Sequence, residues 1–501
     1  MKKYFLFQIT FYFLLFLNNL IVAQDYFLSE HFIDFSKKSI NDYEYQSFFR
    51  PYTGVENTIY ENLIFNTYSS KKNLFLRKLF EENLIVEKND RFKIQINPSL
   101  NFSYFQNLSG PIGYRNTRGA IIQGNLESKI FFYSVLEETQ AAYPFLDKSI
   151  YNNFKIIPGI GRIKPLSGYN EFDFGNSYAV ISYKVNSDIN FTIGYDRIFM
   201  GDGYRSMIIS DFSAPLFFFK SSFNFKHIDV SNIFTKALNP NFNNILNLTN
   251  YLGENVLYPC KYISFNYLKI KSLQKFNFNI IQATVLSQEL KAFKNLIYNI
   301  TPGLNFLFSG IDASKINFLG GINISRFDND LGIFYSQLFF DRIIDKPEFA
   351  FQIGYKNFNL LKSNLFILIE YNYASKDMYI NPDNLSLHYG HYNMPLAHPA
   401  GRNISELVII ANYDLRSFEI LAKSNLYFNK QNFNIINPNL HYEAQSLNHF
   451  FDLQLIYNLN KRNRSQIFAG VILKHYDSFS DSNIFLNFGF RNAIRNNYYD
   501  F

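Results

Sequence analysis

The 501-residue sequence contains no tryptophan, one cysteine and no block of basic residues. A single cysteine, Cys260, excludes an internal disulfide and a cysteine-based metal cluster, so disulfides do not stabilise the fold. The formal charge of +7 is spread along the chain, which argues against a nucleic-acid partner. No long apolar run follows the first 23 residues, so no transmembrane helix is predicted there.

The first 23 residues have the pattern of a secretory signal peptide. Lys2 and Lys3 precede a mostly apolar run over 4–17, and Ala23 provides a small residue just before Gln24. The alternative is an uncleaved anchor helix, but polar residues interrupt the apolar run before it reaches the roughly 20 residues that a spanning helix needs. We therefore expect cleavage after residue 23. The mature chain is then either a soluble secreted protein or a transmembrane β-barrel.

From residue 91 to residue 501 the apolar residues alternate with polar ones, as in β-strands. The clearest stretches are 189–197, 417–428, 451–459 and 484–491. A soluble sandwich also alternates, but strands of ~9–12 residues with polar faces rich in Asn, Gln, Glu, Lys and Arg, joined by alternately short and long connections, favour a membrane barrel. We predict an antiparallel outer-membrane β-barrel of ~16–18 strands in contact with lipid and lipopolysaccharide. The terminal Phe501 resembles the aromatic residue that the barrel-assembly machinery recognises.

Residues 24–90 lack this alternation. The stretch KKNLFLRKLFEENLIVEK, residues 71–88, spaces its apolar residues as on one face of a helix. We expect one amphipathic helix here, within a segment that either lies on the periplasmic side or plugs the barrel.

The lengths of the turns predict where the loops lie. A tight turn at 186–188 places the connection 200–214 at the opposite end of the barrel, and tight turns near 357–359 and 414–416 place 375–403 at that same end. In outer-membrane barrels the long loops are extracellular. Both segments are thus expected at the extracellular mouth, from which they can fold into the lumen.

The first candidate site is FMGDGYRSMIISDFSAP, residues 199–215. The glycine pair matches no nucleotide-binding fingerprint, because no helix follows it. It predicts either a β-bulge or tight loop, or a polar site in which an arginine pairs with an acidic neighbour or binds an anionic sugar or phosphate. The candidate ligand-binding residues are Asp202, Tyr204, Arg205 and Asp211, with Gly201 and Gly203 as structural positions.

The second candidate is HYGHYNMPLAHPAGRNISE, residues 388–406. Three histidines suggest a metal, but their spacing matches no zinc pattern, so neither a metal nor any other cofactor is predicted. The composition suits carbohydrate better, because aromatic rings can cover sugar faces while amide and carboxylate groups hydrogen-bond the sugar hydroxyls. The alternative is an ordered lumenal loop whose polar groups hydrogen-bond one another. The candidate ligand-binding residues are His391, Tyr392, His398, Arg402, Asn403 and Glu406, with Pro399 and Gly401 as structural positions.

A catalytic serine–histidine–acid set can be drawn from these segments, but its serines lack the nucleophile-elbow context. A hydrolase therefore ranks last among the functions considered. The members would be Ser206 or Ser210, His391 or His398, and Asp211.

In these two segments the chain resembles the capsule-assembly Wzi family, above all the Bacteroidetes branch of gliding-motility outer-membrane proteins. Further supporting stretches are LRKLFEENLI (76–85), INPSLNF (96–102), NTRGA (116–120) and YPCKYISFNYL (258–268). The resemblance implies a barrel of about eighteen strands with a small periplasmic helical part. The positions of this chain that match the family motifs are Gly201, Gly203, Tyr204, Arg205, Ser206, Asp211, His391, Pro395, His398, Pro399, Gly401, Asn403 and Glu406. Asp202 replaces a more usual Asn, and Ala400–Arg402 replaces a Leu-Gly-Ala sequence.

The resemblance implies a non-enzymatic barrel that attaches or assembles surface polysaccharide or, in the gliding branch, supports motility. The alternative function is an outer-membrane porin or transport channel.

Overall fold

The structure is a computed structural model of the chain. It describes residues 49–51, 73–127, 129–144, 156–157, 159–166, 171–238, 260–271, 275–287, 316–328, 331–341, 347–360, 364–381, 384–392, 394–415, 417–429, 447–460, 463–476, 482–492 and 498–500. The expected signal peptide and most of the segment 24–90 lie outside these residues.

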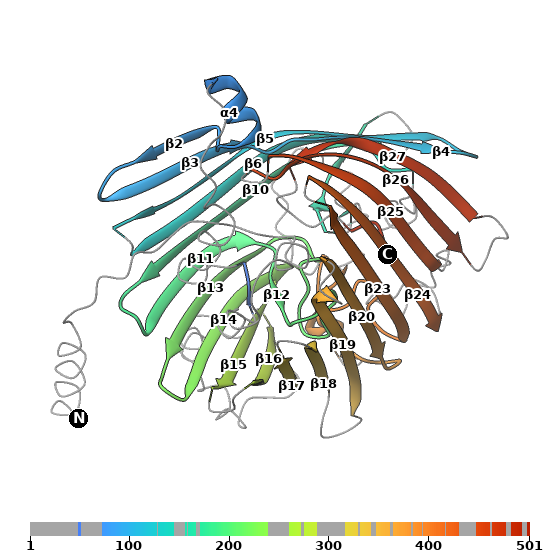
Figure 1. Cartoon of the computed structure of the whole chain (residues 1–501). Coiled ribbons are helices and arrows are strands. Elements are labelled where there is room, and N and C mark those ends of the chain that lie inside the picture. Colours follow the sequence, from blue (N-terminus) through green and yellow to red (C-terminus); the bar gives the residue numbers. More distant parts are fainter. Residues whose placement is uncertain are drawn as a thin grey trace.

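Within the described residues, eighteen antiparallel strands form a closed barrel (Figure 1). Each strand pairs with the next along the chain, and β27 closes the ring by pairing with β4. The predicted fold class is therefore confirmed. The strands are β4 (Asn101–Asn107), β5 (Ile112–Leu126), β6 (Ile130–Ala142), β10 (Glu171–Lys184), β11 (Ile189–Asp196), β13 (Leu216–Asn224), β14 (Ile228–Leu238), β15 (Cys260–Ile270), β16 (Phe276–Ser287), β17 (Ile316–Asp328), β18 (Gly332–Asp341), β19 (Glu348–Leu360), β20 (Leu365–Ala374), β23 (Ile404–Leu415), β24 (Phe418–Asn429), β25 (Leu447–Asn460), β26 (Ser465–Tyr476) and β27 (Ser482–Asn492).

The alternation along each strand divides the side chains between the outer wall and the lumen. On β25, Leu453 and Leu455 are 40% and 52% exposed on the outside, whereas Asp452 and Gln454 are buried inside. An apolar outer face is stable in lipid, and closure of the ring satisfies the backbone hydrogen bonds that lipid cannot. The lumen is in turn lined by polar side chains, which need partners there.

No helix among the described residues is long and apolar enough to cross a membrane.

The amphipathic helix expected over 71–88 is shorter than predicted. The helix α4 (Leu74–Phe80) begins after Asn73, whose side-chain oxygen accepts the Phe75 N–H at 2.8 Å. Within the range predicted to be helical, Ile85–Lys88 instead forms the strand β2, because it pairs with β3 (Phe92–Pro98). β3 in turn pairs with β5. Figure 1 shows this hairpin and α4 at one end of the barrel.

Short turns join the strands at one edge of the barrel, and longer connections join them at the other, apart from the short link 108–111 between β4 and β5. Segments 197–215 and 375–403 both connect strands at the edge opposite the short turns, as their parity predicted. Two expected turns are misplaced, however. β19 continues through 357–359 to Leu360, and β23 continues through 414 to Leu415, because both segments still pair with neighbouring strands.

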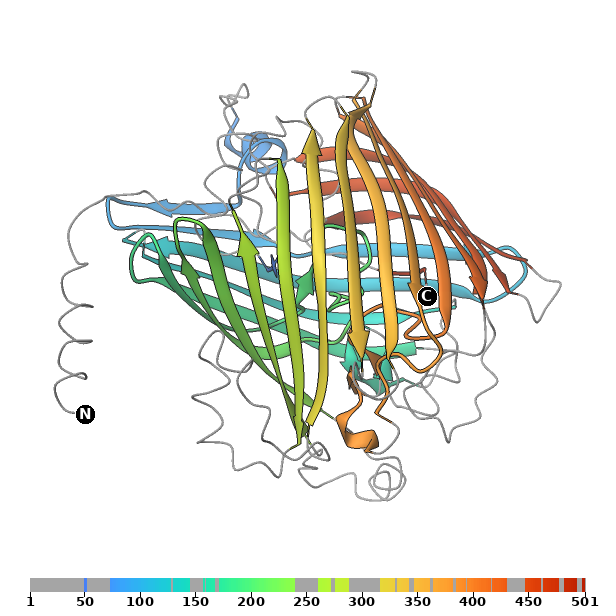
Figure 2. The ribbon, with the colours of Figure 1, turned by 90° about the horizontal axis from the view of Figure 1, so that it is seen from below.

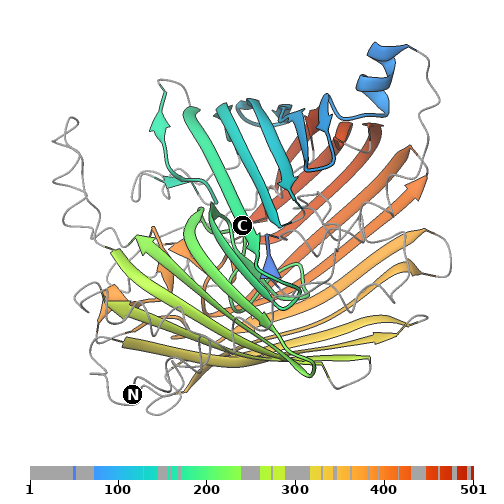
Figure 3. The same cartoon turned by 90° about the vertical axis from the view of Figure 1, so that its left-hand side faces the viewer.

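Several short elements lie off the wall of the barrel. β1 (Phe49–Arg50) pairs with β12 (Phe199–Met200), so this part of the N-terminal segment lies inside the ring, as Figure 3 shows in blue. β21 (Gly390–His391) pairs with β22 (Met394–Pro395), and η6 (Leu385–Leu387) lies at the end with the long connections (Figure 2). β7 (Ile156–Ile157) pairs with β8 (Gly161–Arg162). The remaining short strand, β9 (Lys164–Pro165), pairs with β10 and so belongs to the wall.

Candidate functional site

The loop 201–215 folds into the barrel, and its backbone is held by the inner wall. Tyr204 N and Arg205 N donate to the two carboxylate oxygens of Glu370 at 2.7 and 3.0 Å. Gln352 Nε2 donates to Arg205 O at 2.8 Å. An added Cβ at Gly203 would overlap the ends of the Glu370 and Gln352 side chains and approach Arg205 O, so a larger residue would force these hydrogen-bonded groups to shift. The wall thus approaches the loop at the point where the chain has no side chain.

A second set of contacts holds the loop on either side of this point. Gly201 has φ +145°, a conformation that glycine adopts far more readily than other residues. Gln337 accepts from Met207 N at 2.9 Å, and Ser206 Oγ donates to Met200 O at 2.5 Å. The loop is therefore held in place by polar side chains of the inner wall and by the hydroxyl of its own Ser206.

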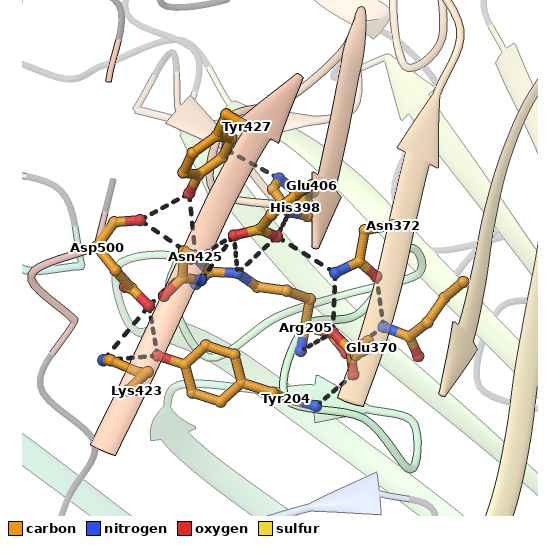
Figure 4. Close-up of polar contacts among 12 residues, drawn as sticks. Tyr204, Arg205, Glu370, Asn372, His398, Glu406, Lys423, Asn425, Tyr427 and Asp500 are labelled. Carbon is orange, nitrogen blue, oxygen red and sulfur yellow. Dashed lines mark hydrogen bonds and ion pairs between the residues drawn. The ribbon is translucent and has the colours of Figure 1, made fainter. Parts of the chain in front are cut away.

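The Arg205 side chain pairs with Glu406 at the start of β23 (Figure 4). Nη2 lies 2.9 Å from Glu406 Oε1, and Nε lies 3.2 Å from Oε2. Asn425 and Asn372 donate to the same carboxylate at 2.8 and 3.2 Å, and His398 Nε2 lies 2.5 Å from Oε2. A buried charge pair is stable only when its remaining lone pairs find donors, and these side chains supply them.

Asp500, which follows the last strand, completes the cluster. Its Oδ2 accepts from Tyr204 OH at 2.7 Å and lies 3.3 Å from Arg205 Nη2 and 3.4 Å from Lys423 Nζ. Its backbone carbonyl accepts from Arg205 Nη2 and from Tyr427 OH, at 3.2 and 2.7 Å. The arginine therefore joins a loop, two wall strands and the segment after β27.

Burial and pairing change the pKa values of the groups that the loops contribute. Burial disfavours the charge on Arg205, but Asp500 and Glu406 outweigh it, so the pKa of the guanidinium is raised and the charge is kept. Burial lowers the pKa of His398, although Glu406 opposes this change. Burial would raise the pKa of Asp500, but Arg205 and Lys423 hold it below its usual value.

Of the ten predicted ligand-binding residues, four lie in this cluster: Tyr204, Arg205, His398 and Glu406. Sequence reasoning missed Glu370, Lys423, Tyr427 and Asp500. Glu370 and Lys423 carried a weak signal, since each is a charged residue at an inward position of a strand. Asp500 and Tyr427 carried none.

Asp202 and Asp211 lie in the same loop but outside the cluster. Asp202 Oδ2 accepts from Asn323 at 2.8 Å, and its carbonyl oxygen accepts from Lys356 at 2.7 Å. Asp211 Oδ1 accepts from Tyr498 OH at 2.5 Å. Neither aspartate is the partner of Arg205, contrary to one expectation from the sequence.

His391 and Tyr392 pack against the end of β14. Leu238 N donates to His391 Nδ1 at 3.0 Å, and Tyr392 N donates to Leu238 O at 3.0 Å. Burial, with a smaller effect of the positive charge of Lys261, lowers the pKa of His391 to about 3. His391 is therefore a neutral anchor of this loop and does not contact the Arg205 cluster.

The last predicted positions shape the turn before β23. Gly401 and Asn403 have positive φ, +73° and +52°, and Gly401 N donates to His398 O at 2.8 Å. This turn sets His398 opposite Glu406, the third residue of β23. Arg402 points away and pairs with Asp377, which is half-exposed, at 3.1 Å. Pro399 is buried.

The serine–histidine–acid set that the sequence allows is not assembled from these residues. Ser210 Oγ accepts from Phe212 N, and Asp211 accepts from Tyr498, while His398 pairs with Glu406. Among the residues that the structure describes, no three His, Cys, Asp or Glu side chains are grouped as metal ligands.

No protein-family model matches the sequence, and no curated protein matches it. Solved structures do match. The structure of Wzi, an outer-membrane protein involved in group 1 capsule assembly in Escherichia coli and described as a carbohydrate-binding β-barrel, covers 95% of this chain and 100% of its own, with a TM-score of 0.55 and 12% identity.

The outer-membrane protein OprD from Pseudomonas aeruginosa covers 81% of this chain and 96% of its own, with a TM-score of 0.40 and 11% identity. OccK5 of the same organism covers 80% of this chain and 97% of its own, with a TM-score of 0.41 and 10% identity. These two scores are too low to support a functional argument. The match to Wzi, at its low identity, shows the fold alone: the chain has the fold of an outer-membrane β-barrel like that of Wzi.

Proposed function

We propose that this chain is a non-enzymatic outer-membrane barrel that attaches or assembles surface polysaccharide, such as a capsule. Its lumen is occupied by the chain itself, and this observation carries the proposal. The loop 201–215 is fastened to the wall through Glu370, Gln337 and the buried Arg205–Glu406 pair. A diffusion channel needs an open lumen, whereas a surface anchor needs a rigid outer mouth.

Resemblance in fold and sequence supports the same function. Wzi of Escherichia coli is described as carbohydrate-binding and as involved in capsule assembly. The sequence stretches of the Bacteroidetes gliding-motility branch extend the proposal to motility, with polysaccharide as the material that the barrel holds. Three further expectations belong to the same proposal: export through a signal peptide over 1–23, a segment 24–90 that lies on the periplasmic side or plugs the barrel, and insertion by the barrel-assembly machinery.

We assign two roles to the predicted site residues. Arg205, His398 and Glu406 are buried and bonded to one another, so they position the loops. Arg402 and Asn403 are partly exposed, and Arg402 pairs with the half-exposed Asp377, so these two residues can contact a sugar hydroxyl. The buried cluster thus holds the mouth in the shape that the outer residues need.

The experiment measures the fraction of polysaccharide that stays on cells in which the gene has been deleted and restored. We expect Arg205→Ala and His398→Ala to release polysaccharide to the medium and to reduce surface spreading. Lys271→Ala is the matched control, because Lys271 pairs with Asp229 beside a short turn at the opposite edge. Wild-type retention and spreading in both site variants, with the barrels present in the membrane, would contradict the proposal.

A further inference from the structure

The helix α4 and the residues after it present an apolar patch at the end of the barrel with the short turns. Phe75, on the helix, is 71% exposed. The other members of the patch, each at least 40% exposed, are Leu74, Leu76, Leu79, Leu84, Ile85 and Val86. Single apolar residues are common on a protein surface, but large ones gathered in one short stretch mark an interaction surface.

The patch lies beside the lipid-facing wall. Asn460, the last residue of β25, donates from Nδ2 to Glu82 O at 2.9 Å and to Lys78 O at 3.3 Å. On the same strand, Leu455 and Tyr457 are exposed on the outside of the barrel. Figures 1 and 3 show α4 projecting from this end of the barrel, away from the lumen. The apolar patch therefore continues the lipid-facing surface at the rim.

The free edge of β2 limits how deep this element can lie in a membrane. β27 pairs with β4 and ends at Asn492, so the corresponding edge of β3 is paired by β2 instead. The second edge of β2 has no partner strand among the described residues. An unpaired strand edge is not stable in the hydrocarbon core, where no water completes its hydrogen bonds. The element must therefore lie at the level of the headgroups, where water is available.

Charge and size distinguish between the partners that could cover the patch. Arg77 Nε and Lys78 Nζ lie 3.1 and 3.2 Å from the carboxylate oxygens of Glu82, so two cations share one anion and the helix offers mainly apolar area. A stable protein–protein contact buries ~800 Å² on each partner, and a helix about 10 Å long presents too small a face for it. A lipid surface needs no such area, so it fits the patch better than a second copy or another protein.

We propose that α4 and the start of β2 anchor the barrel to the phospholipids of the periplasmic leaflet, with the apolar patch inserted at the level of the headgroups. Interfacial amphipathic helices bind in this way, with their apolar face buried a short distance below the membrane surface. The anchor holds the rim where the last strand stops short of β3. The inference needs only a barrel in a membrane, so it does not depend on the proposed polysaccharide function.

The test measures the depth of a fluorescent label on the patch. Full-length barrels with Cys260→Ser receive one new cysteine, are labelled with bimane and are reconstituted in phosphatidylcholine vesicles, which have no net charge. Phe75→Cys reports the patch, Leu453→Cys reports the outer wall of β25, and Ser187→Cys reports an exposed short turn at the same edge. Each variant is checked for heat-modifiable migration, so that only closed barrels are compared.

The expected result is a shallow position for the label on the patch. A lipid with a nitroxide near its headgroup should quench the Phe75→Cys label at least about twofold more than a lipid with a nitroxide near its chain end. The Leu453→Cys label should show the opposite order, because it lies in the middle of its strand. The Ser187→Cys label should respond mainly to iodide in the water.

Two further variants identify the force that holds the patch. With the label at Phe75→Cys, Leu79→Gln should weaken quenching by the nitroxide lipids, because it removes apolar area one helical turn away. Arg77→Gln should leave the quenching unchanged, and an equal loss in both variants would contradict an apolar anchor. Iodide access equal to that at Ser187→Cys would overturn the proposal. Shielding from iodide and from both lipids would overturn it as well, since protein rather than lipid would then cover the patch.

Discussion

Arg205 and Glu406 are 201 residues apart in the sequence, yet Arg205 Nη2 lies 2.9 Å from Glu406 Oε1 and both side chains are fully buried. The contact joins the inward loop to the first residues of β23. Desolvation of two charges is costly, and the surrounding amides and His398 offset that cost only while both partners are present. The pair therefore specifies where the loop lies more than it adds stability.

Arg205→Ala should loosen the loop severely, because it leaves the Glu406 carboxylate buried without its cation. We expect a loss of about 3–5 kcal/mol in the stability of the closed state. The measurement is the temperature at which the barrel loses its heat-modifiable migration. Arg402→Ala is the control, since its pair with the half-exposed Asp377 should contribute at most about 1 kcal/mol. Equal shifts for the two variants would refute this description of the pair.

Gly203→Ala should displace the loop without changing any charge. The added methyl group would overlap the side chains of Glu370 and Gln352, which accept and donate the hydrogen bonds that hold the loop backbone. Gly175→Ala on the outer face of β10 is the matched control, because its added Cβ has an ordinary contact distance of 3.7 Å to Glu137 O. Limited proteolysis of whole cells should cut the loop in the first variant only.

Acid should destabilise the loop that carries His391. Its pKa is about 3 in the folded chain, because burial disfavours the charged ring, and near 6.5 when unfolded. The unfolded state therefore binds the extra proton first, so stability falls as the pH decreases from about 6.5 towards 3. His391→Asn retains an acceptor for Leu238 N and should flatten this decrease. Thermal unfolding from pH 7 to pH 4.5 measures both slopes, and parallel slopes would contradict the assignment.

The loss of stability caused by a charged substitution on the outer wall should depend on how deep in the bilayer the substituted residue lies. Ile353, 58% exposed in the middle of β19, is expected to face lipid, so Ile353→Arg should cost roughly 2–4 kcal/mol. Leu415, at the end of β23 beside a short turn, is 44% exposed, and Leu415→Arg should cost roughly 0–1 kcal/mol near the interface. Reversible unfolding in lipid vesicles gives both values, and a reversed order would place the membrane differently.

The sequence predicted the barrel because alternation and turn length are local properties. It also predicted that Arg205, His398 and Glu406 share a site, although it suggested Asp202 or Asp211 as the partner of the arginine. Alternation shows which side chains point inward but not at what height they meet across the lumen. The roles of Glu370, Lys423 and Asp500 depend on that height.

The helix expected over 71–88 ends at Phe80 for a related reason. Its apolar spacing fits a helix, but Ile85–Lys88 finds a partner strand in β3, and the tertiary pairing outweighs the local preference. The segment Tyr498–Asp500 likewise could not be placed from local sequence, since nothing in its short sequence indicates that it lies inside the barrel.

Conductance of the purified barrel in planar lipid bilayers tests the central claim most directly, namely that the lumen is closed by the chain itself. A lumen closed in this way should give no steady open current in the wild-type protein and frequent open steps in Arg205→Ala, whose loop has lost its buried partner. A steady open pore in the wild-type barrel, as in a diffusion porin, would contradict it.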